Sequence, residues 1–234
     1  MRNSKNKDIS VVIPAYCEEE NLAHLLPRLI QTIKLTKLTY EVLVVDTIKP
    51  LDKTEALCRR YKIKYLKRKG DNSYGSAIRI GIDEAHGQYI LFMDADGSHT
   101  PEFIPKLLKF RHEYEIVVAS RYVGNGKTEN SLSLILMSRI LNWTYAYVLS
   151  IPCKDVSNSF KIYRTIDIKP LKLKANNFDI VEEIIYKVCQ NQPNIRIKEV
   201  PFSFKKRMYG STKRNLFIFV LTFIFTMFKL RFGI

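Results

Sequence analysis

Residues 89–99 read YILFMDADGSH, an apolar run of strand length that ends in two aspartates one residue apart. Successive side chains of an extended chain alternate, so Asp94 and Asp96 are expected on the same side. Like charges placed so closely repel each other unless a cation or hydrogen bonds compensate them. At the carboxyl end of a buried strand, such a pair can hold Mg²⁺ or Mn²⁺ together with diphosphate oxygens. The alternative is an ordinary acidic turn, which the Asp-Gly pair at 96–97 favours.

The first 120 residues alternate strand-like and helix-like segments. Strands are expected at 9–14, 40–45, 63–66, 88–93 and 115–119, and helices at 18–35, 54–61, 73–85 and 101–112. This order predicts an α/β fold with a mostly parallel sheet flanked by helices. Such sheets bind ligands at the carboxyl ends of their strands, where Asp46 and the Asp94/Asp96 pair would lie.

The second half carries two apolar segments that we expect to be helical. Residues 131–151 contain one charge, Arg139, and residues 216–228 contain none. Crossing a bilayer takes about 20 apolar residues, so an interfacial helix fits 216–228 better than a spanning one. A helix buried in a protein interface is the alternative. Two further strands, at 160–163 and 195–200, and a helix at 178–189 are expected between these apolar segments.

The formal net charge of +15 indicates an anionic partner. After Glu199 there is no acidic residue, whereas seven lysines and arginines flank the last apolar run. This favours an acidic membrane surface over nucleic acid, for which no recognition motif is present. The four cysteines are widely scattered, which favours reduced thiols in an intracellular compartment. The polar N-terminus predicts no signal peptide.

Six motifs follow one another along the chain. They are VVIPAYCE at 11–18, YILFMDADGSH at 89–99, SRY with GNG at 120–126, SRILN at 138–142, Asp155 with SFKIYR at 159–164, and YGSTK at 209–213. In this order the motifs resemble those of family 2 glycosyltransferases with the GT-A fold, and more narrowly the dolichyl-phosphate mannosyltransferase group. The resemblance covers about residues 8–215. It implies a catalytic domain over 1–213, with 131–151 as an apolar interface helix within it, and a membrane-associating helix at 214–234.

The resemblance also implies an inverting transfer of a hexose, mannose from GDP-mannose in the first place, to a polyprenyl or dolichyl phosphate. Mg²⁺ or Mn²⁺ is the implied cofactor, with Asp94 and Asp96 as its ligands. Implied catalytic residues are Asp96, Arg121 and Glu183, with Glu182 as the alternative to Glu183. Implied nucleotide-sugar contacts are Pro14, Ala15, Tyr16, Glu18, Asp46, Asp94 and Ala95. Implied acceptor-phosphate contacts are Arg121, Ser138, Arg139, Lys161, Arg207 and Lys213.

The chain departs from the family pattern at two places. The second strand usually ends in VDDGS, but residues 45–50 read VDTIKP, which alters the loop beside the nucleotide. The family's SFR has Lys161 in place of its arginine, so the planar bidentate fork is lost. Glu18 at the start of a helix also serves dipole compensation. His99 is expected to be a turn residue rather than a metal ligand.

A lipid-phosphate acceptor explains the cationic second half. Its phosphate oxygen is already anionic at neutral pH, since its second pKa is about 6, and needs cations more than a base. Alternatives are a UDP-glucose-type donor and a saccharide hydroxyl acceptor, which would need a base such as Glu182 or Glu183. Non-enzyme alternatives are an inactive nucleotide-sugar scaffold and a nucleic-acid-binding protein. We expect association with the cytoplasmic face of a membrane, with a membrane subunit as a further partner.

Overall fold

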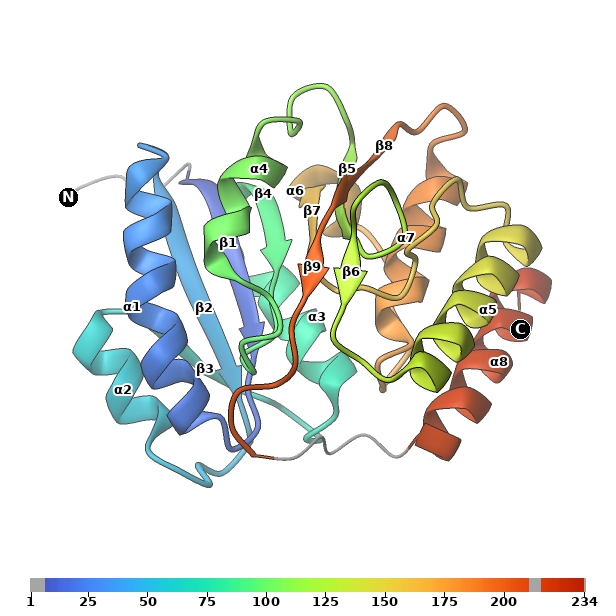
Figure 1. The fold of residues 1–234 in the computed structure, drawn as a ribbon. Coiled ribbons are helices and arrows are strands. Elements are labelled where there is room, and N and C mark those ends of the chain that lie inside the picture. The colour runs from blue at the N-terminus through green and yellow to red at the C-terminus, as the bar shows by residue number, and fades with distance from the viewer. Residues whose placement is uncertain (1–6, 211–215, 234) are drawn as a thin grey trace.

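The computed structural model of the chain describes residues 7–210 and 216–233, of which residues 216–220 by backbone alone. A seven-stranded sheet of order β3-β2-β1-β4-β7-β5-β8 forms the centre (Figure 1). Its strands are β1 (Lys7–Pro14), β2 (Tyr40–Asp46), β3 (Lys64–Lys67), β4 (Gly87–Phe92), β5 (Ile116–Ser120), β7 (Lys161–Arg164) and β8 (Ile197–Pro201). Strand β7 is antiparallel to both β4 and β5, and the other neighbouring strands are parallel. The predicted α/β fold with a mostly parallel sheet is therefore confirmed.

Helices cover both faces of this sheet. They are α1 (Glu19–Leu35), α2 (Thr54–Tyr61), α3 (Tyr74–Glu84), α4 (Ile104–Leu108), α5 (Leu132–Val148), α6 (Thr165–Ile168), α7 (Ile180–Asn191) and α8 (Leu216–Phe232). A short 3-10 helix, η1 (Pro101–Phe103), precedes α4, and β6 (Lys127–Thr128) pairs with β9 (Ser203–Phe204) outside the main sheet. One hydrophobic core joins α1 and α4 to the sheet, and a second joins α3 and α7 to the opposite face.

Side-chain alternation along β1 explains why there are two cores. Val11 and Ile13 belong to the core beneath α1, whereas Val12 belongs to the core beneath α3. Helix α3 approaches β1 closely at Gly81, where a Cβ atom would lie 2.2 Å from a Val12 methyl group. A strand buried on both faces must be apolar throughout, and residues 9–14 meet that requirement apart from Ser10.

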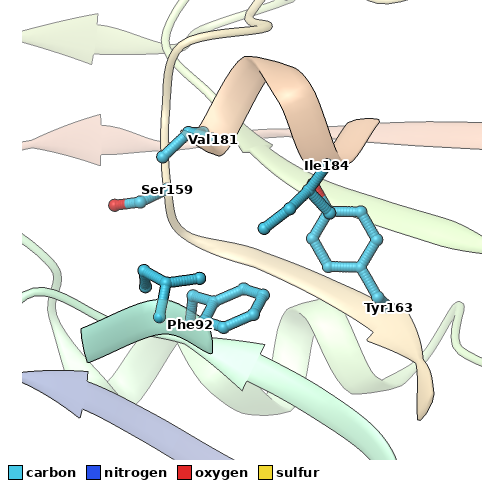
Figure 2. Close-up of a pocket in the computed structure, with 6 residues that line it drawn as sticks. Phe92, Ser159, Tyr163, Val181 and Ile184 are labelled. Atoms are coloured by element: carbon cyan, nitrogen blue, oxygen red, sulfur yellow. The ribbon is translucent and has the colours of Figure 1, made fainter. Parts of the chain in front are cut away.

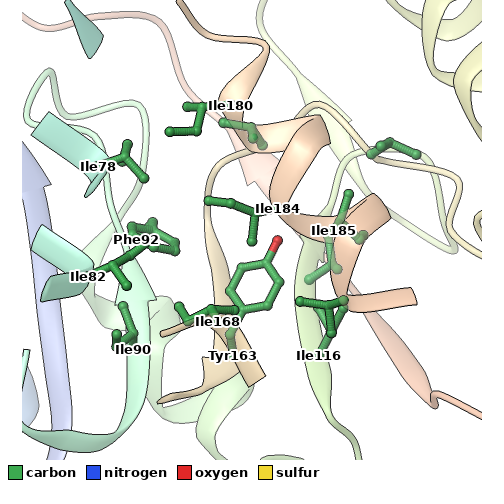
Figure 3. Packing of buried hydrophobic residues seen from close by; sticks show 14 of the residues in the cluster. Ile78, Ile82, Ile90, Phe92, Ile116, Tyr163, Ile168, Ile180, Ile184 and Ile185 are labelled. Atoms are coloured by element: carbon green, nitrogen blue, oxygen red, sulfur yellow. The ribbon is translucent and has the colours of Figure 1, made fainter. Parts of the chain in front are cut away.

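The core beneath α3 and α7 holds the second half of the chain onto the first (Figure 3). Isoleucines from α3 and α7 converge there on Phe92 of β4 and Tyr163 of β7. Phe223 and Met227 attach α8 to the same core, and the Tyr145 hydroxyl of α5 donates a hydrogen bond to the Phe223 carbonyl oxygen at 3.0 Å. Helices α5 and α8 consequently lie side by side at one end of the molecule (Figure 1).

Except at 101–112, the expected helices end within three residues of the observed limits. The predicted helix at 101–112 is η1 followed by the short α4, because beyond Leu108 the backbone forms turns such as Phe110 N–H to Leu107 O. The C-terminal helix, expected within 214–234, is α8, which continues past the apolar run 216–228 to Phe232. Among the helices of the described segments, none has the length and apolar character that crossing a membrane requires.

Candidate active site

A cleft of about 1010 Å³ opens where the turns after β1, β3, β4 and β5 meet. Carboxylates and cations line the part next to the sheet. Apolar side chains of α5, α7 and α8, among them Leu134, Val181 and Phe223, line the other end. Ligands of parallel α/β sheets bind at this edge, so the cleft is the candidate active site.

Asp94 and Asp96 both line the cleft, as the sequence predicts. The chain leaves β4 after Phe92, and the two carboxylates sit in the turn that follows. Asp94 Oδ1 accepts hydrogen bonds from the Tyr74 hydroxyl at 3.2 Å and the Ser159 hydroxyl at 3.0 Å. Asp96 Oδ1 accepts from the backbone and side chain of Ser98, at 3.0 and 2.6 Å. The pair is thus oriented by neighbours and still faces the cleft.

A small cavity lies behind this turn, between the strands and α7 (Figure 2). Its volume is about 10 Å³, which is room for one water molecule at most. Phe92, Tyr163 and Ile184 make it apolar, and the Ser159 hydroxyl points away from these side chains (Figure 2). Ser159 therefore links the core to Asp94 without opening the core to solvent.

The chemistry of this turn fits a divalent cation. The side chains of Asp94 and Asp96 are 28% and 24% exposed, so carboxylate oxygens are accessible from the cleft. Within residues 7–210 and 216–233, no group of three or more His, Cys, Asp or Glu side chains is placed to hold a metal. Mg²⁺ is usually held by one or two carboxylates plus substrate phosphates, so two aspartates suffice for a site completed by a diphosphate.

Arg207 lines the cleft beside the aspartate turn, and its contact with an acceptor phosphate stays a prediction. Its Nη2 donates to both carboxylate oxygens of Glu18 at 2.6 Å, and its Nη1 is 3.6 Å from Asp96 Oδ2. The next residue, Met208, donates its backbone N–H to Asp96 O at 2.9 Å. Gly97 permits this contact: its φ is +82°, and a Cβ there would lie 2.5 Å from the Met208 sulfur. Segment 205–210 therefore crosses directly over the aspartate turn.

The turn after β1 forms the floor of this side, where Pro14, Ala15, Tyr16 and Glu18 line the cleft as predicted. Ala95 lines it as well. Sequence reasoning missed Arg68, which is 4% exposed and also lines the cleft. The available signal was an arginine directly after a short strand, at the edge where ligands bind.

Arg68 is tied to the β1 turn. It donates to Ala15 O at 2.7 Å and to Asn72 O at 2.6 Å, and burial lowers its pKa. The guanidinium is therefore a fixed positive charge beside the residues predicted to contact the nucleotide.

Asp46 does not reach the cleft, and its predicted contact with the base or ribose is not supported. Its carboxylate is 1% exposed and accepts a hydrogen bond from the Tyr65 hydroxyl at 3.0 Å. Burial raises the pKa of Asp46 and, together with that carboxylate, raises the pKa of the neighbouring Cys58 to about 12. The altered loop after β2 is held against the segment after β3, because Asn72 Oδ1 accepts a hydrogen bond from the Ile48 N–H at 2.9 Å.

Arg121 lines the opposite wall of the cleft and is held rigidly. Its Nε and Nη2 donate to the two oxygens of Asp155 at 2.9 and 2.6 Å, and Nη2 also donates to the Ser157 hydroxyl at 3.0 Å. Burial opposes its charge, but the Asp155 carboxylate prevails and raises the pKa of Arg121. Glu199 fixes Asp155 in turn by accepting its backbone N–H at 3.1 Å. These contacts leave Nη1 for a ligand, as an anion-binding role requires.

Helix α5 brings one of its two predicted residues to the cleft. Ser138 lines it and accepts a hydrogen bond from the Tyr122 hydroxyl at 2.7 Å. Asn142, on the same face, donates to the Ser157 hydroxyl at 2.9 Å. Arg139 is exposed, does not line the cleft, and has its guanidinium carbon 5.5 Å from the centre of the Tyr122 ring. Its predicted direct contact with a phosphate is not supported in this conformation.

Two other predicted residues have structural contacts instead. Lys161 is fully buried, and its ammonium donates to the carbonyl oxygens of Val156 and Asn158, so it holds the loop before β7 and does not face a phosphate. Burial lowers the pKa of Lys161.

Glu183 also lies away from the cleft. It accepts from the Lys174 and Ala175 backbones and from Lys187 Nζ, at 2.9, 2.8 and 2.6 Å. Its neighbour Glu182 lines the cleft, so the structure favours the alternative expectation. Lys213 lies outside the described residues.

The comparisons with solved structures define the class of fold. Glucosyl-3-phosphoglycerate synthase of Mycobacterium tuberculosis, crystallised with Mn²⁺, UDP and glucosyl-3-phosphoglycerate, superposes with a TM-score of 0.72 at 17% identity, over 97% of this chain and 81% of that one. The same enzyme with Mg²⁺ and UDP gives 0.71 at 16% identity, over 97% and 80%. The fold is accordingly that of GT-A glycosyltransferases.

Sequence comparisons assign the family. The model of glycosyl transferase family 2 matches residues 10–184, and the chain belongs to this family. Dolichol-phosphate mannosyltransferase of Pyrococcus furiosus is 34% identical over 212 residues, which are 88% of this chain and 58% of that protein. The protein of the same name from Saccharomyces cerevisiae is 28% identical over 217 residues, 88% of this chain and 80% of that one. The chain thus spans little more than half the length of the Pyrococcus relative.

Proposed function

We propose that the protein transfers a hexose from a nucleotide sugar to a polyprenyl phosphate of the dolichyl type, with mannose from GDP-mannose as the first choice of donor. One observation carries this proposal. A single cleft contains the Asp94/Asp96 pair, the oriented cation of Arg121, and an apolar end built by α5 and α8. A phosphate on an isoprenoid chain matches this sequence of polar and apolar surfaces, and two relatives bear the name dolichol-phosphate mannosyltransferase.

The donor would lie along the wall formed by the turns after β1, β3 and β4. Pro14, Ala15 and Tyr16 would bound the nucleoside, and the fixed charge of Arg68 lies beside them. When Mg²⁺ or Mn²⁺ is bound by Asp94 and Asp96, it supplies positive charge for the departing diphosphate. The Arg207 guanidinium, 3.6 Å from Asp96, adds positive charge at the same edge.

The acceptor phosphate would bind at the opposite wall, at Nη1 of Arg121. An anionic phosphate oxygen attacks the anomeric carbon as the bond to the diphosphate oxygen breaks, so the configuration at that carbon is inverted. Because the attacking oxygen carries no proton at neutral pH, no general base is required. The contacts from Asp155 and Ser157 keep Arg121 in one orientation, which spares the entropy of ordering it during the reaction.

The apolar end of the cleft continues onto an exposed face of α5 and α8. Leu132, Trp143 and Tyr147 of α5 are 85%, 67% and 75% exposed, and Phe225 and Phe232 of α8 are 61% and 67% exposed. Large apolar side chains at such exposure are typical of an interaction surface. We place this face against the cytoplasmic side of a membrane, where the lipid acceptor resides, with a membrane subunit as a further partner.

The experiment that tests the proposal offers a panel of radiolabelled nucleotide sugars together with phytanyl or dolichyl phosphate. We expect label to enter the organic phase from GDP-mannose, in a reaction that requires Mg²⁺ or Mn²⁺. Label from UDP-glucose alone would replace the donor and keep the acceptor. Transfer to a water-soluble saccharide, with none to the lipid, would overturn the proposed acceptor. Absence of transfer from every donor, with nucleotide sugar still bound, would indicate an inactive scaffold.

A further inference from the structure

His99 follows the aspartate turn and is fully buried, although nothing in the proposed reaction uses it. Its imidazole stacks on Phe160, with ring centres 4.7 Å apart and planes 11° apart. The edges of Phe202 and Phe204 enclose it at 6.2 and 5.6 Å. A histidine in so apolar a box needs a partner for each ring nitrogen, since a buried polar atom without one is costly.

Both ring nitrogens of His99 have partners, and these partners determine where the proton lies. Nδ1 accepts a hydrogen bond from the Asp94 backbone N–H at 3.0 Å. A nitrogen that accepts carries no proton, so the proton of the neutral ring is on Nε2. Nε2 lies 3.0 Å from Asn158 Oδ1 and donates to it, and the Asp94 Oδ2 atom is 3.8 Å from the same nitrogen. The ring thus connects the backbone of the aspartate turn with a residue 59 positions away.

Asn158 connects this link to the opposite wall of the cleft. Its Nδ2 donates to Ala119 O at 2.6 Å, two residues before Arg121. It also lies in the loop that contains Asp155 and Ser157, which hold the Arg121 guanidinium. One continuous path of hydrogen bonds therefore runs from the Asp94 backbone through His99 and Asn158 to the strand end that carries Arg121.

We infer that His99 and Asn158 are positioning residues that fix the distance between the metal-binding turn and the phosphate-binding arginine. His99 does not line the cleft, and Asn158 lines it with only 3% of its surface exposed. Transfer in line requires the anomeric carbon and the phosphate oxygen to approach in near-attack geometry, and small misplacements there are costly. The buried, fully satisfied network holds the two walls in one arrangement. The Arg121 half of this inference rests on the proposed transfer to a phosphate, whereas the Asp94 half does not.

Two substitutions at position 99 distinguish the effects of its two hydrogen bonds. In His99→Asn the amide oxygen can take the place of Nδ1 and accept from Asp94 N–H, but the bond to Asn158 is lost. In His99→Phe the stacking on Phe160 is kept and both bonds are lost. Asn158→Ala removes the far end of the link. His112→Asn and His112→Phe are matched controls at an exposed histidine, which contacts Tyr89 by a hydrogen bond and an edge-on ring contact.

The first measurement is the affinity for Mn²⁺ alone, from the electron paramagnetic resonance signal of the free ion, which needs neither donor nor acceptor. We expect His99→Phe to weaken Mn²⁺ binding about 10- to 100-fold, as is usual for residues that orient metal ligands. His99→Asn and Asn158→Ala should bind Mn²⁺ like the wild type, because Asp94 keeps its partner. Unchanged Mn²⁺ affinity in His99→Phe would overturn the inference. If His99→Phe does not fold, His99→Asn provides the test. A weakened Mn²⁺ affinity in that variant would also overturn the inference.

The second measurement separates kcat from KM in the transfer to phytanyl phosphate. We expect His99→Asn and Asn158→Ala to lower kcat about tenfold or more, as is usual when a residue that orients a functional group is replaced. KM for the donor should be unchanged. The double variant should be no slower than either single one, because both remove the same link. Multiplying effects, or wild-type kcat in both, would overturn the link to Arg121. A wild type without transfer from any donor would refute the proposed function, while the Mn²⁺ measurement would still decide the role of His99.

Discussion

The two walls of the cleft are built in different ways. The donor wall consists of short turns that directly follow β1, β3 and β4, and its carboxylates are oriented partly by close neighbours such as Ser98. The acceptor wall consists of Arg121 and the loop 155–159, held by partners 34 to 79 positions apart in the chain. A turn that follows a strand is a local feature, whereas an arginine oriented by distant carboxylates is a tertiary one. The difference teaches that short motifs place the carboxylates of the proposed donor wall, although Ser159 and Arg207 reach them from distant segments, whereas the assembled fold orients the arginine of the proposed acceptor wall.

The largest effect should come from breaking the acceptor wall with Asp155→Ala. It leaves the buried Arg121 charge without its bidentate partner, which typically costs about 3–5 kcal/mol of unfolding free energy. Urea unfolding followed by circular dichroism measures this loss. Glu55→Ala is the control, because its pair with Arg59 is exposed and should contribute only about 0.3–0.5 kcal/mol. Equal losses in the two variants would mean that the acceptor wall does not depend on its buried ion pair.

The donor wall should lose activity rather than stability when its second carboxylate is neutralised. Asp96→Asn keeps the hydrogen-bond acceptor for Ser98 but removes the charge, so we expect turnover to fall about 10²- to 10³-fold, as when a preorganised electrostatic group is lost. Single-turnover assays with labelled donor measure it. The exposed Asp83, on α3, provides the control Asp83→Asn, which should leave turnover unchanged. Turnover of Asp96→Asn equal to that of the wild type would refute the proposed use of the pair.

A smaller effect should come from the buried carboxylate of Asp46, which lies at the end of β2 and does not reach the cleft. Its pKa is raised by burial above the ordinary value of about 3.9, so the folded state loses stability as pH rises through the interval between these values. Asp46→Asn removes that loss. Its unfolding free energy should therefore increase relative to the wild type as pH rises above about 4, by about 1.4 kcal/mol for each pKa unit of the shift.

Asp71 is the control with the opposite sign. Hydrogen bonds from Ser73 lower its pKa, so its contribution to stability is present above the unfolded-state pKa and is lost as pH falls. Relative to the wild type, Asp71→Asn should lose stability as pH rises toward about 4, and the difference should then stay constant at higher pH. The same pH trend in both variants would contradict the assignment of a buried carboxylate to Asp46.

The smallest effect should come from the exposed apolar face of α5 and α8, next to the proposed acceptor wall. The prediction tests whether this face binds a membrane. Leu132→Ala removes an apolar side chain that is 85% exposed on α5. If this face rests on a membrane, the loss should be about 1 kcal/mol, or roughly fivefold in partitioning to vesicles. Leu35→Ala is a matched control, because Leu35 is 76% exposed at the end of α1, on the other side of the sheet. Flotation with anionic vesicles measures both, and equal partitioning would place the membrane elsewhere.

Periodicity and motif order predicted much of the first half. The helix at 54–61 has the predicted limits, and the five strands predicted in the first 120 residues end within two residues of the observed limits. Asp94, Asp96 and the 14–18 turn reach the cleft as expected, because each follows a strand whose direction the apolar pattern reveals. The antiparallel direction of β7 was not predictable in this way, since alternation is the same in either direction.

Predictions of site residues from residue type alone were not supported where the charged side chain is buried and paired within the protein. Lys161 and Glu183 match charged positions of the family but have backbone carbonyl or amide partners in the structure. Arg68 directly follows a short strand, but its burial, which sets it apart from the exposed bases around it, is not visible in the sequence. Arg207 pairs with Glu18, 189 positions away, and this contact is not visible in the sequence. Such pairings depend on the path of the chain through space.

The sequence by itself determined the class of fold, the position of the paired aspartates at a strand end, and the presence of two apolar helices in a basic second half. These follow from local alternation, helix spacing and charge, which are properties of short segments. Only the tertiary structure decided which charges face the cleft, which are neutralised within the protein, and how His99 joins the two walls. The reason is physical. The state of a charged side chain depends on the solvent and partners around it, and in this fold the partners come from distant parts of the chain.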